Sequence, residues 1–253
     1  PIYHHFLSVY FFSHMEQTRL YHGDESGRDS QGIPVNSAYP EILKYLPVPT
    51  WCVHLVFICV GVAVGQAAAW PIYHHVADHR VPSKLQSLGS QDLGWLYLAV
   101  YVLKTGSVLL NIQATSWRRK ARINVPDQHV YKVWTPPGGP ALPYVMFETE
   151  GDLGRFNRSQ RAVQNYQEYL PGVLVTAVMA GYVFPFPVFI LTLVYVASRM
   201  VMAVRYTESS DGRKAGFILS LLVSLMLDGL LLLVAYKVIT EEWTAPPPAV
   251  EVQ

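Results

Sequence analysis

The sequence predicts an all-α integral membrane protein, an up–down bundle of four helices preceded by one extra N-terminal transmembrane helix. Apolar residues make up 51% of the 253 residues and charged residues only 15%, whereas a soluble domain carries about 25% charged residues. The charges also lie between long uncharged stretches that approach or exceed the ~20 residues needed to cross a bilayer as a helix. The net charge of +1 gives no bulk attraction to nucleic acid, which we exclude as a partner.

The N-terminal third is predicted to hold one transmembrane helix between two polar segments. Residues 1–50 mix aromatic, polar and proline-rich stretches, and we expect an extramembranous arm. Residues 51–70 carry no formal charge and are bracketed by Trp51 and Trp70. Twenty helical residues span ~30 Å, and aromatic residues favour both membrane interfaces. We therefore predict an extra transmembrane helix here, followed by a polar linker over 71–92.

The membrane domain is predicted over residues 93–240. Apolar periodic segments place its helices at about 93–117, 157–183, 186–207 and 215–238. The proline- and glycine-rich segment 123–157 is expected to be irregular, and the FPFP sequence at 184–187 to form a tight turn. Residues 241–253 form the tail.

Basic residues support this topology. The loops after the second and fourth of the five predicted helices carry the basic residues Arg118, Arg119, Lys120, Arg122, Lys132, Arg155, Arg158, Arg205, Arg213 and Lys214. In an up–down bundle these loops share one side, which the positive-inside rule assigns to the cytosol or the mitochondrial matrix. Because the chain starts at Pro1 rather than Met, we expect it to derive from a longer precursor, and a removed organelle-targeting peptide would fit.

A set of polar residues lies at the start of the predicted helix 157–183. Arg161, Asn165 and Glu168 follow the i, i+4, i+7 spacing of one helix face. Polar groups at membrane depth turn towards protein or a watery cavity. These residues either form a self-satisfied interhelical network or line a pocket. Such a pocket would suit a small peptide-like zwitterion, because Arg binds carboxylates, Glu binds an ammonium group and Asn binds amides.

The same segment carries a family resemblance. FNRSQRAVQNYQEYLPG (156–172) resembles the signature of the MAPEG family, the membrane-associated proteins of eicosanoid and glutathione metabolism, and within it the type 3 microsomal glutathione transferases. NIQATSWRRKAR (111–122) and ASRMVMAVRYTESSDGRKAG (197–216) also resemble family segments. The resemblance covers roughly residues 90–240.

The resemblance implies a four-helix protomer, usually in a homotrimer, that binds glutathione as co-substrate. It implies a transferase or peroxidase acting on lipophilic electrophiles in a mitochondrial or endoplasmic reticulum membrane. The implied catalytic residue is Arg213, near the thiolate. The implied glutathione contacts are Arg118 or Arg119 at the carboxylates, and Arg161, Asn165, Glu168, Tyr169 and Tyr206.

Several departures favour an alternative function. Met202 stands where family enzymes usually carry a tyrosine, and Val163 replaces a residue that is often polar. Residues 1–89, with the extra helix, lie outside the family pattern. The alternative is a non-catalytic accessory subunit of a large organellar membrane complex, for example a mitochondrial respiratory complex, that keeps the MAPEG fold.

Two further residue sets were weighed. Lys104 and Asp228 lie mid-helix, each 14 residues from a basic residue (Arg118 and Lys214), which predicts a salt bridge within the bundle or between subunits. His74, His75 and His79 have helical spacing, but no Asp, Glu or Cys set completes a coordination shell. No metal site is expected.

Overall fold

The computed structural model describes residues 35, 50–76, 80–125, 127–134 and 144–244. Most of the predicted arm, His79, the tip of the proline-rich loop and the tail beyond residue 244 lie outside the described residues. The elements are, in chain order, α2 (Thr50–Pro71), a π-helical turn (Ile72–Val76), α3 (Arg80–Ser90), α4 (Gly94–Lys120), β1 (Tyr131–Trp134), β2 (Tyr144–Phe147), α5 (Gly151–Gly181), α6 (Pro185–Glu208), a 3-10 turn (Ser210–Gly212) and α7 (Arg213–Thr244).

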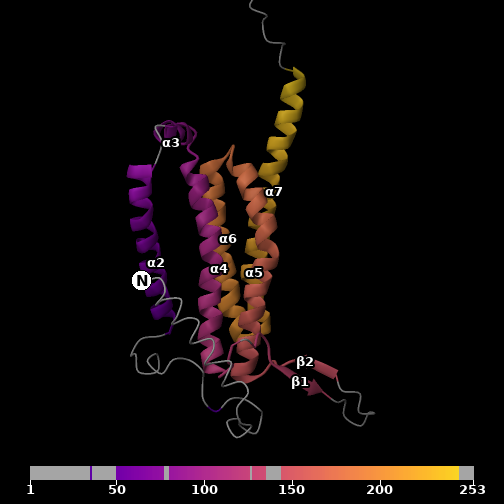
Figure 1. Ribbon diagram of the computed structural model, residues 1–253. Helices are drawn as coiled ribbons and strands as arrows, with labels where there is room; N and C mark the ends of the chain where they lie inside the picture. Colours follow the sequence, from indigo (N-terminus) through magenta and orange to yellow (C-terminus); the bar gives the residue numbers. More distant parts are fainter. Residues whose placement is uncertain (1–34, 36–49, 77–79, 126, 135–143, 245–253) are drawn as a thin grey trace, which may run out of the picture.

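Helices α4 to α7 form the predicted up–down bundle (Figure 1). α5 and α6 pack against each other and both contact α4 and α7. The core between them is built from aliphatic and aromatic side chains that are almost fully buried, among them Leu103, Leu110, Tyr166, Tyr195 and Leu227. The all-α membrane fold class is therefore confirmed.

Four of the five predicted membrane helices are long and apolar enough to span a bilayer among the described residues. These spans are Trp51–His75, Gly94–Lys120, Pro185–Glu208 and Ser210–Thr240. α5 has 31 residues, which is sufficient length, but its N-terminal part and middle carry charges such as Arg158, Arg161 and Glu168. Its packing against the three other bundle helices places it inside the membrane domain.

The loop predicted to be irregular contains an antiparallel hairpin. Tyr131 pairs with Phe147 and Trp134 with Tyr144, and α5 already begins at Gly151 rather than near residue 157. YKVW and YVMF are rich in the aromatic and β-branched residues that favour strands. The prolines and glycines that suggested irregular structure lie mainly between the strands, at 135–143.

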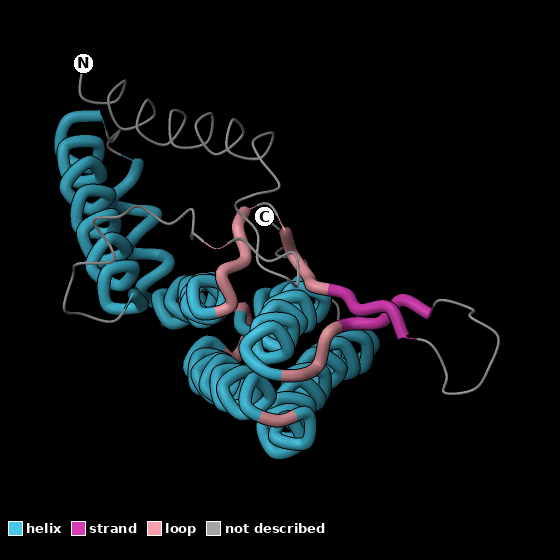
Figure 2. Tube along the Cα trace, turned by 90° about the horizontal axis from the view of Figure 1, so that it is seen from below, coloured by secondary structure: helices cyan, strands magenta, loops and turns pink. Residues whose placement is uncertain are grey.

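The predicted linker over 71–92 is helical where it is described, except for a turn at residues 91–92. The π-helical turn extends α2, and α3 follows at Arg80–Ser90. α2 stands beside the bundle, on the side away from the hairpin (Figure 2). A hollow of about 320 Å³ lies between α2 and α4, where His54, Phe57 and Ile58 of α2 face Asn111 and neighbouring residues of α4.

The tight turn between α5 and α6 differs slightly from the predicted FPFP turn. α6 starts at Pro185, with Phe184 as its N-cap residue. Proline suits the first helical position because its missing N–H has no intrahelical partner there.

The predicted pair of Lys104 and Asp228 is wrong within the chain. Tyr166 donates a hydrogen bond to the carbonyl of Leu103 at 2.6 Å, which places Lys104 near the level of Tyr166. Asp228 accepts one from Thr176 at 3.3 Å. Thr176 lies ten residues further along α5, about 15 Å at 1.5 Å per residue. Counting residues from the basic side misjudged the depth, because α4 reaches further towards that side than α7.

Candidate functional site

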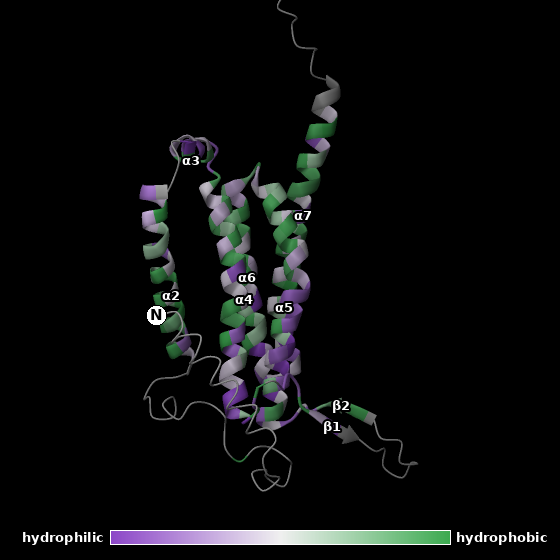
Figure 3. Ribbon diagram, in the orientation of Figure 1, coloured by the Kyte–Doolittle hydropathy of each residue, from purple (hydrophilic) through white to green (hydrophobic). Residues whose placement is uncertain are grey.

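Most basic residues of the four-helix bundle gather at one end. The C-terminal ends of α4 and α6 and the N-terminal ends of α5 and α7 meet there, beside the hairpin (Figure 1). Hydrophilic residues are concentrated at this end, while the opposite halves of the helices are mostly apolar (Figure 3). This arrangement confirms that the loops after the second and fourth predicted helices lie on the same side.

A cavity of about 520 Å³ opens near this basic end, between α5, α6 and α7. Its volume lies in the range of small-molecule sites. It is lined by Arg161, Ala162, Asn165, Tyr169, Met202, Tyr206, Arg213, Lys214, Phe217 and Ile218. Five of the eight residues predicted from the sequence are thus brought together, namely Arg161, Asn165, Tyr169, Tyr206 and Arg213.

The helical repeat and one close approach position these side chains. Arg161, Asn165 and Tyr169 are four residues apart and share one face of α5. A Cβ atom on Gly216 of α7 would lie 2.6 Å from the backbone nitrogen of Met202 on α6. Only glycine therefore permits α7 to lie this close to α6, which holds the first turns of α7 against the cavity.

Glu168 takes part through Arg161 rather than through the cavity wall. Its Oε1 lies 2.8 Å from Nη1 of Arg161, and the two side chains are 52% and 47% exposed. An exposed ion pair of this kind contributes about 0–1 kcal/mol. A charged ligand can therefore replace either partner of this ion pair at little cost in free energy.

Arg199 of α6 is a buried cation that the site prediction missed. It is 2% exposed, and its Nη1 donates to Oδ1 of Asn165 at 2.6 Å. Its guanidinium carbon lies 4.8 Å from the ring centre of Tyr169. The sequence signal was present, since Arg199 is the only charged residue between Pro185 and Val204.

Arg118 and Arg119 lie away from the cavity. Arg118 is 7% exposed, and its Nη1 donates to the carbonyls of Asn124 and Asp127 at 3.2 and 2.5 Å. Its guanidinium also covers the ring of Phe156, 4.9 Å from the centroid. Arg118 therefore ties the loop after α4 to the bundle, and neither arginine lines the cavity.

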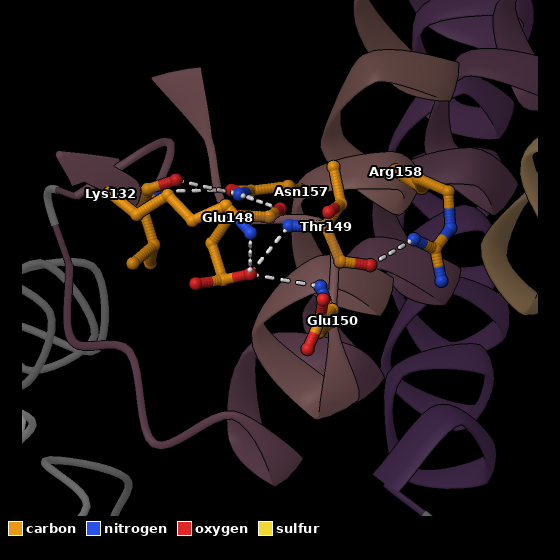
Figure 4. Close-up of polar contacts among 7 residues, drawn as sticks. Lys132, Glu148, Thr149, Glu150, Asn157 and Arg158 are labelled. Atoms are coloured by element: carbon orange, nitrogen blue, oxygen red, sulfur yellow. Dashed lines mark hydrogen bonds and ion pairs between the residues drawn. The ribbon is translucent and has the colours of Figure 1, made fainter. Parts of the chain in front are cut away.

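Asn157 fixes the hairpin beside the bundle (Figure 4). Its Oδ1 accepts from the amide of Val130 at 2.8 Å. Its Nδ2 donates to the carbonyls of Val130 and Glu148 at 2.7 and 2.8 Å. The next residue of α5, Arg158, donates to the carbonyls of Thr149 and Thr207. These two side chains join the hairpin, α5 and the end of α6.

Two titratable groups of this loop are shifted. Partial burial would raise the pKa of Glu148, but hydrogen bonds from the Glu150 amide, the Lys132 ammonium and the Thr149 amide hold the pKa below its usual value. Partial burial, together with the positive charges of Arg161 and Arg118, lowers the pKa of His129. The His129 ring is therefore held neutral at physiological pH.

The cavity has two chemically different parts. Arg213, Lys214 and Arg161 offer exposed cations, which suit carboxylates. Met202 and Phe217 form an apolar wall that is largely buried. Tyr206 lies beside Arg213, whose guanidinium is 5.8 Å from the tyrosine ring centre. Such a site can hold a small, charged, peptide-like molecule with a less polar end pointing inward.

The remaining site expectations concern metal ions and residue 163. No group of three His, Cys, Asp or Glu side chains that could hold a metal ion occurs within the described ranges. Val163 is buried in the bundle core, so a polar residue there would not reach the cavity in this chain.

Comparison with known protein families gives a match over the four-helix bundle. A model of the MAPEG family matches residues 95–233, which is more than half of the 253-residue chain. The matched range includes α4, α5, α6, most of α7 and every residue that lines the cavity. No curated protein matches the chain.

Proposed function

The chain belongs to the MAPEG family, and from this premise we propose that its cavity binds glutathione and uses it against lipophilic electrophiles, as type 3 microsomal glutathione transferases do. The observation that carries the proposal is the gathering of Arg161, Asn165, Tyr169, Tyr206 and Arg213 around one cavity. These residues come from three helices, and the family resemblance of the sequence implies a role in glutathione binding or activation for each of them.

Each part of the cavity has a complementary part of the ligand. The exposed cations Arg161 and Lys214 suit the two carboxylates of glutathione, because arginine and lysine form charge-assisted hydrogen bonds with carboxylates. Glu168, beside Arg161, suits the ammonium group. The thiol side chain of the central cysteine, the least polar part of the tripeptide, fits the wall formed by Met202, Phe217 and Ile218.

Arg213 is the residue that we assign to the thiolate. It opens α7, so its guanidinium and the positive end of the helix dipole act on the same region. A nearby cation lowers the pKa of a thiol and favours the nucleophilic thiolate. The protein contributes position and charge, whereas the reactive sulfur belongs to glutathione.

The proposed reaction balances without a further cofactor. The thiol proton passes to solvent at the basic end, and the sulfur electron pair forms a bond with the electrophilic carbon while the leaving group departs with its electrons. With a lipid hydroperoxide, the sulfur attacks an oxygen and releases an alcohol. A second glutathione then forms the disulfide and water is lost.

The test is glutathione binding and turnover by the purified full chain. We expect Arg213→Ala to lower kcat about 100- to 1,000-fold, the range found for loss of one group that stabilises a developing anion. Glu168→Ala should weaken binding. Arg205→Ala is the matched control, because Arg205 is an exposed arginine on α6 that does not line the cavity. Wild-type protein that binds no glutathione would refute the proposal.

A second candidate function is that of an accessory subunit, and α2 favours it. No residue in the most apolar stretch of its membrane span is buried. A Cβ atom on Gly61 or Gly65 would meet nothing within 4 Å. Small residues spaced in this way let membrane helices approach closely. Under this proposal α2 packs against another membrane protein of a large organellar complex.

The two functions predict different behaviour in mild detergent. An accessory subunit migrates as a stoichiometric part of a large assembly, and Gly61→Leu with Gly65→Leu releases it. A glutathione transferase of this family migrates as a homotrimer, and the same substitutions leave it intact. Fractionation of expressing cells distinguishes the mitochondrial from the endoplasmic reticulum membrane.

A further inference from the structure

Arg199 is the most deeply buried charge beside the cavity, and no carboxylate in the described part of the chain forms an ion pair with it. It is 2% exposed and lies on α6 between the helices that form the cavity wall. The ion pairs of the described residues include none to Arg199, and its Nε is buried without a hydrogen-bond acceptor there. A buried ion without a counter-ion costs several kcal/mol.

The contacts of Arg199 are neutral and belong largely to the cavity wall. Nη1 donates to Oδ1 of Asn165 at 2.6 Å and to Sδ of Met202 at 3.7 Å. The rings of Tyr169 and Phe217 lie 4.8 and 5.7 Å from the guanidinium carbon. Amide, thioether and aromatic groups lower the cost of burying the cation. They leave its charge in place, directly behind four residues that line the cavity.

The bond to Arg199 also determines what Asn165 can offer. Because the amide oxygen accepts from Arg199, the amide NH₂ group is left as the donor towards a ligand. The sequence predicts that Asn165 binds amides of the ligand. Because its oxygen is occupied, Asn165 instead favours a hydrogen-bond acceptor on the ligand. The positive charge of Arg199 behind it favours a negatively charged acceptor.

We propose that Arg199 is a positioning residue that turns the inner end of the cavity into an anion subsite, with Asn165 as its donor to the ligand. The identity of the anion rests on the proposed function: it is the thiolate or a carboxylate of glutathione. The exposed cations Arg161, Arg213 and Lys214 are screened by solvent, whereas Arg199 acts through a low-dielectric interior where charge interactions are stronger.

Three ligands and two substitutions test the subsite. The ligands are glutathione itself, glutathione sulfonate, which carries a permanent negative charge at sulfur, and S-methylglutathione, which carries none there. All three keep the carboxylates. Wild type should bind the sulfonate at least 10-fold more tightly than the S-methyl compound if the anion is the sulfur. Arg199→Met should abolish this preference and Arg199→Lys should keep part of it. An equal loss of affinity for all three ligands would place a carboxylate at the subsite. Unchanged affinities in Arg199→Met would overturn the proposal.

Asn165→Asp supplies a test that needs no ligand. The substitution puts a carboxylate where Oδ1 now lies 2.6 Å from Nη1 of Arg199, so it neutralises the buried charge within the protein. We expect Tm to rise while anion binding is lost. Asn111→Asp, at an exposed position of α4 away from this cavity, should not raise Tm.

The outcomes separate the two proposals. Wild-type protein that binds none of the three ligands would refute the glutathione function. The Tm of Asn165→Asp would still show whether the charge of Arg199 lacks a counter-ion. A Tm that stays level or falls in Asn165→Asp would overturn the inference about Arg199. Should Arg199→Met fail to fold, Arg199→Lys and Asn165→Asp give the same decision.

Discussion

Asn157→Ala should release the hairpin from the bundle without unfolding the helices. The substitution removes three hydrogen bonds of 2.7–2.8 Å made by a side chain that is 5% exposed. At a net value of about 1 kcal/mol for each bond, with an added cost for the unpaired Val130 amide, the local loss is about 2–4 kcal/mol. The carbonyl of Val130 keeps one donor, the amide of Glu148, which limits the loss.

Amide hydrogen exchange in detergent or nanodiscs measures this loss. A destabilisation of about 2–4 kcal/mol corresponds to roughly 30- to 1,000-fold faster opening at 1.4 kcal/mol per factor of ten. The faster exchange should be confined to the amides of Val130 and Glu148, because local opening leaves the core intact. Gln160→Ala is the control, since it removes only an exposed contact of 3.3 Å to Gln128. Exchange at Val130 that matches wild type in Asn157→Ala would refute the clamp.

Three further substitutions probe the bundle and its loop. Gly216→Ala should lower Tm and weaken glutathione binding, because its Cβ would lie 2.6 Å from the α6 backbone. Overpacking of this kind costs about 1–3 kcal/mol. The control Gly172→Ala, whose Cβ would meet nothing within 4 Å, should change neither. Tyr166→Phe should cost about 1 kcal/mol through the lost bond to Leu103, measured by thermal unfolding against exposed Tyr182→Phe. The lowered pKa of Glu148 means that its contribution is complete above the ordinary value of 4.5 and is lost as pH falls through the shifted pKa. Exchange protection of the hairpin should therefore fall in acid for wild type, and Glu148→Gln should abolish this dependence.

Hydropathy predicted the bundle because the membrane imposes a length and a composition that a sequence displays directly. The helix ends were misjudged where neighbouring segments take part. α5 begins at Gly151 because the hairpin before it is anchored by Asn157, a contact between segments that no local pattern contains. The depths of Lys104 and Asp228 in the membrane were misjudged for the same reason. Their positions along the bundle axis follow from contacts with α5 and not from their distance to the nearest basic residue.

The candidate site was predictable to the extent that it follows a helix face. Arg161, Asn165 and Tyr169 share one face of α5, and the cavity lies against it. Arg118 could not be placed in this way, because its role depends on a loop that turns back to offer the carbonyls of Asn124 and Asp127. Residue type alone did not separate an arginine that binds a ligand from one that binds the backbone.

The hydrogen-bond partners of each arginine distinguish those that hold the backbone from those that can bind a ligand. Arg118 and Arg158 donate to backbone carbonyls at the basic end, so their loss exposes unpaired carbonyls and lowers stability. Among the described residues, Arg161 is held only by exposed Glu168 and Gln164, and Arg199 only by neutral groups of the cavity wall. The positive charges of these two arginines can therefore act on a ligand. A bundle kept only as a scaffold needs the first pair of arginines, whereas the anion subsite that we propose would account for the burial of Arg199.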